Sequence, residues 1–207
     1  MSTILTSSHP RPDPVLPGFR HIRRFWDAPR ERFVAKILPG QYYVTQNTEA
    51  IATILGSCIS VCIRDPERGI GGMNHFLLPG GNAQAAHEEI VKEKPCARYG
   101  IHAMDMLIKD LLYHGARREN LEIKVAGGGK VISTGGDVGN HNIAFVREYL
   151  ALNNLPVFAE DVGDYFPRKV LYFPESGRLM IRKLKDQTAD DHVRRRENKF
   201  FHAIEDE

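Results

Sequence analysis

Cys58 and His75 are the two residues whose types and spacing could carry out nucleophilic chemistry. A cysteine thiolate attacks a carbonyl carbon once a neighbouring base has taken its proton, and histidine is the side chain that most often serves as this base. The separation between the two residues is enough for a strand, a turn and most of a returning strand, and neighbouring strands lie about 5 Å apart. The spacing therefore predicts a thiol–imidazole pair held by a β-hairpin.

A tight turn precedes the cysteine and breaks two apolar runs. Gly56 and Ser57 form this turn, where a sharply bent backbone brings several N–H groups together. Converging N–H groups lower a thiol pKa and stabilise an oxyanion, so we expect Gly56 and Ser57 to contribute to an oxyanion site. The opposing interpretation is that Cys58 is a small buried hydrophobe, which is the usual state of a free cysteine.

The imidazole of His75 would need a third group to orient it. The nearby hydroxyl residues are Thr53, Ser57 and Ser60, and Thr53 lies on the strand that enters the turn. Its hydroxyl could meet a ring nitrogen of His75. A β-branched residue that simply favours a strand would explain Thr53 equally well.

The other reactive side chains are given no catalytic role. Cys62 falls within the apolar pattern of a strand and is expected in the core, and Cys96 beside a proline is expected in a loop. His102 and His141 could complete a metal site with the cysteine or histidine above, but no pair has the close spacing typical of zinc ligands. We expect no metal and no cofactor.

The glycine-rich segment at 127–129, followed by Lys130, resembles a phosphate-binding loop only superficially. It lacks both the Walker spacing and the GxGxxG pattern. We expect a turn at the end of a strand, where the backbone closely approaches a substrate or another strand.

Composition narrows the class of protein. The chain has 207 residues, of which 42% are hydrophobic, and this is enough to build the core of one α/β domain. A net charge of +2, without a basic strip carrying aromatic residues, argues against binding nucleic acid. Three cysteines without a CxxC pair indicate free thiols in a reducing compartment. No apolar run has the length of a signal peptide core or a bilayer span, so a cytoplasmic protein that is not itself a membrane protein is expected.

The predicted secondary structure changes along the chain from strands to alternating strands and helices, and then to a closing hairpin. Strands are expected at 41–47, 50–55, 60–64, 70–76, 121–126, 155–160, 170–173 and 178–184. Helices are expected from 98 to the glycine at 115 and over 137–152, and a long loop over 80–95. The pattern predicts an α/β domain in which a mixed sheet is covered by two main helices, while part of the strands could stack as a second sheet.

Three segments divide the chain. Residues 1–38 form a proline- and arginine-rich N-terminal extension, 39–184 the domain, and 185–207 a charged C-terminal tail. Within the extension, 19–38 is expected to be a solvated lead-in that packs on the edge of the domain, although an amphipathic docking segment is the alternative. The tail could form a terminal helix that docks through Phe200 and Phe201.

Leu-Gly-Ser-Cys-Ile-Ser-Val stands at 55–61, and Gly-Met-Asn-His follows at 72–75. With these segments, the sequence closely resembles the CheD family of chemoreceptor glutamine deamidases over residues 41 to 184. Further matching segments lie at 65–66, 78–79, 98–100, 126–129, 161–163, 168–170 and 176–178.

The resemblance implies a three-layer α/β sandwich with mixed β-sheets, related in its active site to the deamidating cytotoxic necrotizing factor toxins. It implies a triad in which Cys58 is the nucleophile, His75 the base and Thr53 the third member. The expected reaction converts glutamine side chains of methyl-accepting chemotaxis receptors to glutamate with release of ammonia, and the family also demethylates receptor glutamyl esters. A CheC-type phosphatase is the further partner that the resemblance implies.

Two positions depart from the family pattern. Thr53 lies five residues before the cysteine, whereas some members carry the threonine six before it, where this chain has Ala52. His141 stands where the family usually has arginine. Two other functions compete with deamidation: a non-catalytic adaptor that docks on receptors or a phosphatase, and a cysteine peptidase.

Overall fold

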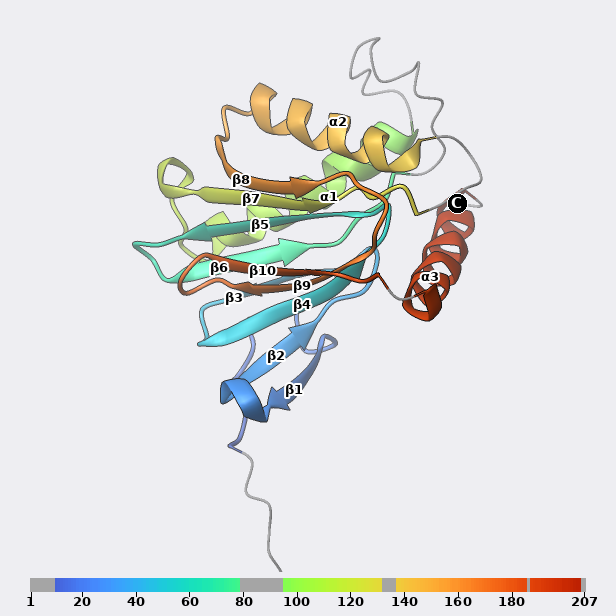
Figure 1. Cartoon of the computed structure of the whole chain (residues 1–207). Coiled ribbons are helices and arrows are strands. Elements are labelled where there is room, and N and C mark those ends of the chain that lie inside the picture. Colours follow the sequence, from blue (N-terminus) through green and yellow to red (C-terminus); the bar gives the residue numbers. More distant parts are fainter. Residues whose placement is uncertain (1–9, 79–94, 132–136, 186, 206–207) are drawn as a thin grey trace, which may run out of the picture.

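Strands β4 (Glu49–Leu55) and β5 (Ile59–Asp65) lie at the centre of the protein, and almost all of their residues are buried. Both are rich in β-branched residues, which pack well on a pleated surface. Each strand occupies the middle of its own sheet, so both of its edges are hydrogen-bonded to neighbouring strands. The computed structural model describes residues 10–78, 95–131, 137–185 and 187–205 (Figure 1).

The first sheet has the order β1-β2-β4-β9-β10. Strands β2 and β4 run parallel, and the other neighbours run antiparallel. The bounds of the strands other than β4 are Arg23–Asp27 for β1, Arg32–Lys36 for β2, Arg168–Phe173 for β9 and Arg178–Lys183 for β10. A short 3-10 helix at Ala28–Arg30 joins β1 to β2.

The second sheet has the order β3-β6-β5-β7-β8. Strands β7 and β8 run parallel, and the other neighbours run antiparallel. The bounds of the strands other than β5 are Tyr42–Thr45 for β3, Ile70–Asn74 for β6, Glu122–Gly127 for β7 and Val157–Val162 for β8. Another 3-10 helix, Arg118–Asn120, precedes β7.

Helices α1 (Pro95–Tyr113) and α2 (Val138–Leu152) cover the face of the second sheet that points away from the first (Figure 1). In α1, Met104, Leu107 and Leu111 recur at helical spacing and are fully buried. The side chain of Asp137 caps α2 by accepting a hydrogen bond from the backbone N–H of Asn140. The result is the three-layer α/β sandwich with mixed sheets that the resemblance implied.

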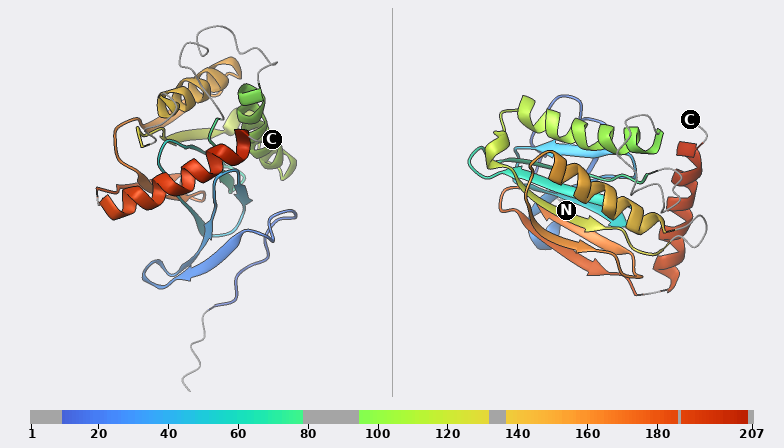
Figure 2. Two further views of the ribbon diagram at one scale, coloured as in Figure 1. Left: turned by 90° about the vertical axis from the view of Figure 1, so that its right-hand side faces the viewer. Right: turned by 90° about the horizontal axis from the view of Figure 1, so that it is seen from above.

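A third helix, α3 (Gln187–Glu205), belongs to neither face. Figure 2 shows it crossing one end of the sandwich, beside the ends of strands from both sheets. The prediction of a helix in the C-terminal tail is therefore confirmed, and the described chain has three main helices where the pattern of the domain indicated two. The side chain of Phe201, one of its two predicted anchors, falls outside the described part of the chain. Among the helices in the described segments, none combines the length and apolar character needed to cross a bilayer.

Three predictions about the elements need correction. Residues 19–38 are not a solvated lead-in, because β1 and β2 extend the first sheet through β4, and Phe19 and Ile22 are buried. The predicted boundary at 38 thus cuts through the residues of this sheet. Cys96 lies in α1 rather than in a loop, and the strand expected over 70–76 ends at Asn74. The remainder of the predicted long loop, 80–94, falls outside the described residues.

Candidate active site

The turn at 56–58 joins the two sheets, because β4 belongs to the first and β5 to the second. Cys58 is completely buried in this turn. The glycine-rich segment after β7 holds the turn from the opposite side: Gly128 N–H donates to the Cys58 carbonyl at 2.7 Å, and Gly129 N–H donates to the Gly56 carbonyl at 2.8 Å. The glycines therefore approach another backbone segment, one of the two roles predicted for them.

We call the glycine-rich segment 127–129 the clamp, because it holds the cysteine turn. Only glycine fits at its first position. Gly127 has a φ of 119°, and a Cβ added there would lie 2.1 Å from the carbonyl oxygen of Cys58. Both the backbone conformation and the space exclude a side chain. The backbone position of Cys58 is consequently set by contacts within the sandwich.

His75 follows β6 directly and is 1% exposed. The antiparallel pairing of β5 with β6 continues past the strands through a bridge between Ile59 and Phe76. The backbone N–H of His75 also donates to the Gln41 carbonyl at 2.9 Å. These contacts place the histidine beside the cysteine turn, as the hairpin spacing predicted.

Thr53 supplies the hydroxyl that contacts the imidazole. Its Oγ1 lies 2.7 Å from Nδ1 of His75 and donates to the carbonyl of Ile37 at 2.9 Å. Because a hydroxyl has one proton and this one is given to Ile37, Oγ1 accepts the second bond from the Nδ1–H of His75. This network assigns the tautomer in which Nε2 carries no proton.

The imidazole of His75 belongs to a compact group of reactive side chains. Nε2 of His75 is buried and makes no hydrogen bond within the described part of the chain. A ring nitrogen of His75, the sulfur of Cys58 and a carboxylate oxygen of Glu197 all lie within 4.8 Å of one another. An unprotonated imidazole nitrogen this close to a thiol can act as its base.

Glu197 comes from α3, and its carboxylate binds the backbone of the cysteine turn. Oε1 accepts hydrogen bonds from the N–H of Gly56 at 2.6 Å and of Cys58 at 3.3 Å, and Oε2 accepts one from Ser57 at 2.7 Å. Three N–H groups thus converge on one carboxylate, and the role of Gly56 and Ser57 as an oxyanion site stays a prediction. The carboxylate is 0% exposed.

The sequence did not indicate a role for Glu197, which lies in a segment dominated by charged residues. One feature could have revealed it: Val193, Glu197 and Phe200 share one face at helical spacing. In the structure Val193 is buried and Phe200 packs partly against the core. An acidic residue between two apolar residues on a buried face indicates a specific partner for the carboxylate.

Asn142 of α2 is a second residue that sequence reasoning missed. Its Nδ2 donates to the Ser57 carbonyl at 2.8 Å, and its Oδ1 accepts from the Leu78 N–H at 2.9 Å. The side chain is completely buried. It therefore ties the cysteine turn to the segment that follows His75.

Burial and neighbouring charges keep the pair uncharged. Burial, and then the negative charge of Glu197 and its hydrogen bond, raise the pKa of the Cys58 thiol well above its ordinary value. Burial, and then the positive charge of Arg196, lower the pKa of His75 well below its ordinary value. With α3 in place, the pair is held as a neutral thiol and a neutral imidazole.

The same three side chains are of types that bind metal ions. Both oxygens of Glu197 already accept hydrogen bonds from the turn, so they are engaged without a cation. The histidines proposed as alternative ligands lie elsewhere: His102 is exposed on α1, and His141 lies in the first turn of α2. Neither belongs to the buried group, and the absence of a metal stays a prediction.

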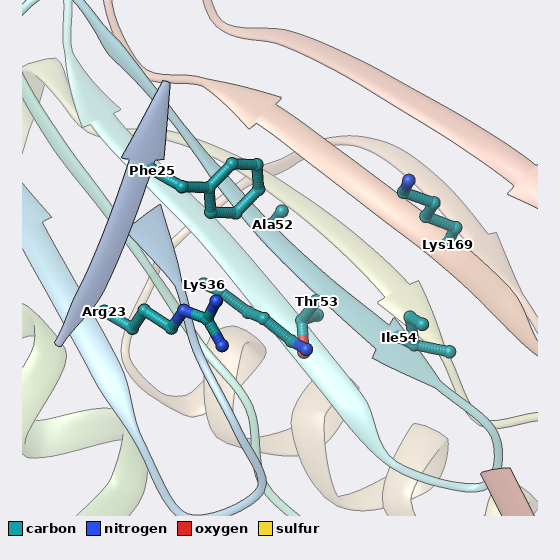
Figure 3. A pocket seen from close by; sticks show the side chains of 7 residues that line it. All are labelled: Arg23, Phe25, Lys36, Ala52, Thr53, Ile54 and Lys169. Atoms are coloured by element: carbon teal, nitrogen blue, oxygen red, sulfur yellow. The ribbon is translucent and has the colours of Figure 1, made fainter. Parts of the chain in front are cut away.

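A separate hollow lies on the outer face of the first sheet (Figure 3). It has a volume of about 300 Å³, and three basic side chains from different strands, Arg23, Lys36 and Lys169, contribute to its walls. Thr53 also contributes to it, but Cys58 and His75 do not line it. The hollow is thus distinct from the buried pair.

Comparison with known proteins identifies similar chains. Residues 77–183 match the family model described as CheD chemotactic sensory transduction. A protein of Halorhodospira halophila named probable chemoreceptor glutamine deamidase CheD is 47% identical over 192 residues, covering 93% of this chain and 88% of the relative. Proteins with the same name from Hahella chejuensis and Methylobacillus flagellatus are 46% identical over 190 residues and 51% identical over 166 residues, covering 91% and 79% of this chain and 89% and 80% of the relatives.

Proposed function

Because this chain belongs to the CheD family, we propose that it is a chemoreceptor glutamine deamidase that hydrolyses selected glutamine side chains to glutamate and releases ammonia. The observation that carries the proposal is the binding of a glutamate carboxylate by the turn of Cys58, within reach of the imidazole. A glutamate side chain is the product of glutamine deamidation. The site therefore accommodates the group that the reaction would form.

The first half of the reaction uses the base and the turn. Nε2 of His75 takes the proton of Cys58, and the thiolate attacks the carbon of the substrate carboxamide. The N–H groups that now hold Glu197 stabilise the oxygen of the tetrahedral intermediate. The imidazolium then protonates the nitrogen as the carbon–nitrogen bond breaks, so ammonia leaves and a thioester remains.

The second half of the reaction restores the enzyme. His75 takes a proton from water, and the resulting hydroxide attacks the thioester carbon. The carbon–sulfur bond breaks, the cysteine recovers its proton and the side chain leaves as glutamate. A glutamyl methyl ester would follow the same path with methanol as the leaving group.

Thr53 acts as the orienting member of the proposed triad. Its hydroxyl accepts the Nδ1–H of His75 and thereby keeps Nε2 free to act as the base. When the imidazole becomes protonated, Nδ1 keeps the same hydrogen bond, so the ring need not move during the proton transfers.

Receptors are the proposed protein substrates, since the relatives are named for chemoreceptors. The proposed place of action is the cytoplasm, and a CheC-type phosphatase is a proposed second partner. Each deamidation would replace a neutral receptor side chain by an anion and so change the local charge of the receptor.

The alternative of a non-catalytic adaptor gains one observation, which is the complete burial of Cys58 and the raised pKa of its thiol. However, Glu197 of α3 is one cause of the raised pKa, and an adaptor would not need a neutral imidazole within 4.8 Å of a thiol. Deamidation explains the whole arrangement, whereas the adaptor explains only the burial.

The deciding experiment incubates the purified full chain with a receptor cytoplasmic fragment and measures conversion of glutamine to glutamate by peptide mass spectrometry. We expect conversion at specific positions together with ammonia release and no chain cleavage. Cys58→Ala should abolish it, and Cys62→Ala, which removes a buried thiol from the core, is the matched control. Full activity in Cys58→Ala would contradict the assignment of the nucleophile, and chain cleavage would favour the peptidase.

A further inference from the structure

The carboxylate of Glu197 lies where the proposed reaction places the acyl group of its substrate. Its oxygens accept hydrogen bonds from the three N–H groups assigned to the oxyanion, and one of them lies within 4.8 Å of the cysteine sulfur. Glutamate is also the proposed product. The chain therefore carries its own copy of the product side chain, seated in the proposed acyl site.

The turn is shaped for such a close approach. A Cβ added at Gly56 would lie 2.5 Å from Oε2 of Glu197, which is too short for any real contact. The glycine is needed here because a carboxylate lies directly on the backbone. A substrate carboxamide bound by the same N–H groups would impose the same requirement.

The helix that carries Glu197 docks through one face. Val193, Glu197 and Phe200 all point toward the sandwich, and a Cβ added at Gly40 would lie 3.1 Å from the ring of Phe200. Arg196 Nη2 donates to the carbonyl of Ile54 at 2.5 Å, just before the cysteine turn. The end of the sandwich thus accepts a helix that has a carboxylate side chain at the centre of its docking face.

The helix is an addition to the sandwich rather than part of its core. The main cluster of buried core residues in the described chain draws on both sheets, α1 and α2, and only Phe200 of α3 packs against it while partly exposed. The clamp on the cysteine turn likewise comes from the segment after β7. The cysteine turn therefore has supports that do not come from α3.

We propose that α3 is a resident product mimic, which the substrate glutamine must displace to reach Cys58. The proposal rests on the deamidase function proposed above and adds a form of regulation to the same site. It explains why the site is closed in the isolated chain. It also explains why Glu197 opposes ionisation of the thiol, since the charge of a bound product disfavours a second anion beside it.

The most direct test changes the mimic of the product into a mimic of the substrate. In Glu197→Gln, the introduced carboxamide should be hydrolysed by the Cys58 of its own chain, so peptide mass spectrometry of the purified protein should find glutamate at position 197. The double variant Cys58→Ala with Glu197→Gln should keep the amide. Because the reaction occurs within one chain, its rate should not depend on protein concentration.

The outcome separates this proposal from the function on which it rests. If wild-type protein deamidates the receptor fragment while the amide introduced at 197 persists, the product-mimic proposal is overturned and the deamidase function stands. If neither reaction occurs, the deamidase function itself fails. If the amide is also lost in the double variant, the loss is spontaneous and the proposal is overturned.

A second test measures how readily the site opens. Phe200→Ala removes an apolar anchor of α3, and Lys199→Ala changes an exposed neighbour on the same helix as the matched control. Iodoacetamide should modify Cys58 about tenfold faster in Phe200→Ala, and receptor deamidation should rise, with the control unchanged. A fall in receptor deamidation in a folded Phe200→Ala or Glu197→Ala variant would overturn the proposal, because it would make α3 part of the working site.

Discussion

The cysteine turn and helix α3 meet at the same atoms but are held in different ways. Backbone hydrogen bonds from the segment at 127–129, a buried asparagine and strand pairing hold the turn. The face of α3 is held by one carboxylate, one arginine and a few apolar contacts. The difference indicates that the main supports of the turn are built into the sandwich, whereas α3 adds the hydrogen bonds of Glu197 and Arg196.

The strongest test of a prebuilt turn is Gly127→Ala. A methyl group there would meet the Cys58 carbonyl oxygen in a backbone conformation that alanine disfavours, so we expect a loss of about 3 kcal/mol or more in the free energy of unfolding. Gly163→Ala is the control, since Gly163 also has positive φ but has open space around it, and its cost should be about 1 kcal/mol. Urea unfolding measures the free energy of unfolding of both variants. Equal losses would contradict the close contact between residue 127 and the Cys58 carbonyl.

Thr53→Val tests whether the bond to the imidazole matters for the reaction. The variant keeps the shape of the side chain but removes the acceptor of the Nδ1–H, so receptor deamidation should fall by about 10²-fold in kcat. Thr53→Ser restores a hydroxyl and should recover most of the rate. An unchanged kcat in Thr53→Val would remove the threonine from the proposed triad.

Asn142→Ala probes the second support of the turn. It leaves the Ser57 carbonyl and the Leu78 N–H without their buried partner, which should cost about 1–3 kcal/mol in the free energy of unfolding. Asn140→Ala, at an exposed position on the same helix, should cost less. Denaturant unfolding of the two variants gives the comparison, and equal costs would contradict a supporting role for Asn142.

The pH dependence of thiol alkylation distinguishes the turn from the helix that covers it. Since only the thiolate reacts and the pKa of Cys58 is raised, alkylation should be slow at neutral pH and should increase with pH beyond the ordinary thiol pKa of about 8.5. Glu197→Ala removes a negative charge beside the sulfur, so the alkylation curve should move to lower pH. The shift would be recorded by measuring iodoacetamide rates over about four pH units that include the ordinary thiol pKa. If the curve of Glu197→Ala did not move, burial alone would account for the raised pKa.

The parts of the site that the sequence predicted lie on regular elements of the sandwich. The hairpin spacing placed His75 beside Cys58 because strand pairing converts a sequence interval into a distance. The sequence also predicted α1 and α2, since their apolar residues recur with the period of a helix. Thr53 emerged as a candidate because it lies on the strand that leads into the turn, and its hydroxyl does contact the imidazole.

The parts that the sequence did not predict depend on contacts between distant segments. Arginines interrupt the apolar pattern of β1 and β2, and Phe25 is 42% exposed at the edge of the sheet, so the short strands lack a clear alternation. Glu197 meets the turn across a sequence separation of about 140 residues, and local patterns carry no information about such a contact. Asn142 presents the same difficulty, since its two partners come from other elements.

The bond between Thr53 and His75 joins the two sheets, because Thr53 lies on β4 of one sheet and His75 follows β6 of the other. Any sliding of one sheet against the other would stretch this bond, while Cys58 and His75 would move together on paired strands. The length of the hydrogen bond between Thr53 and His75 therefore depends on how the two sheets are aligned. A change in this bond would alter the strength of the base without any change in the contacts of the thiol.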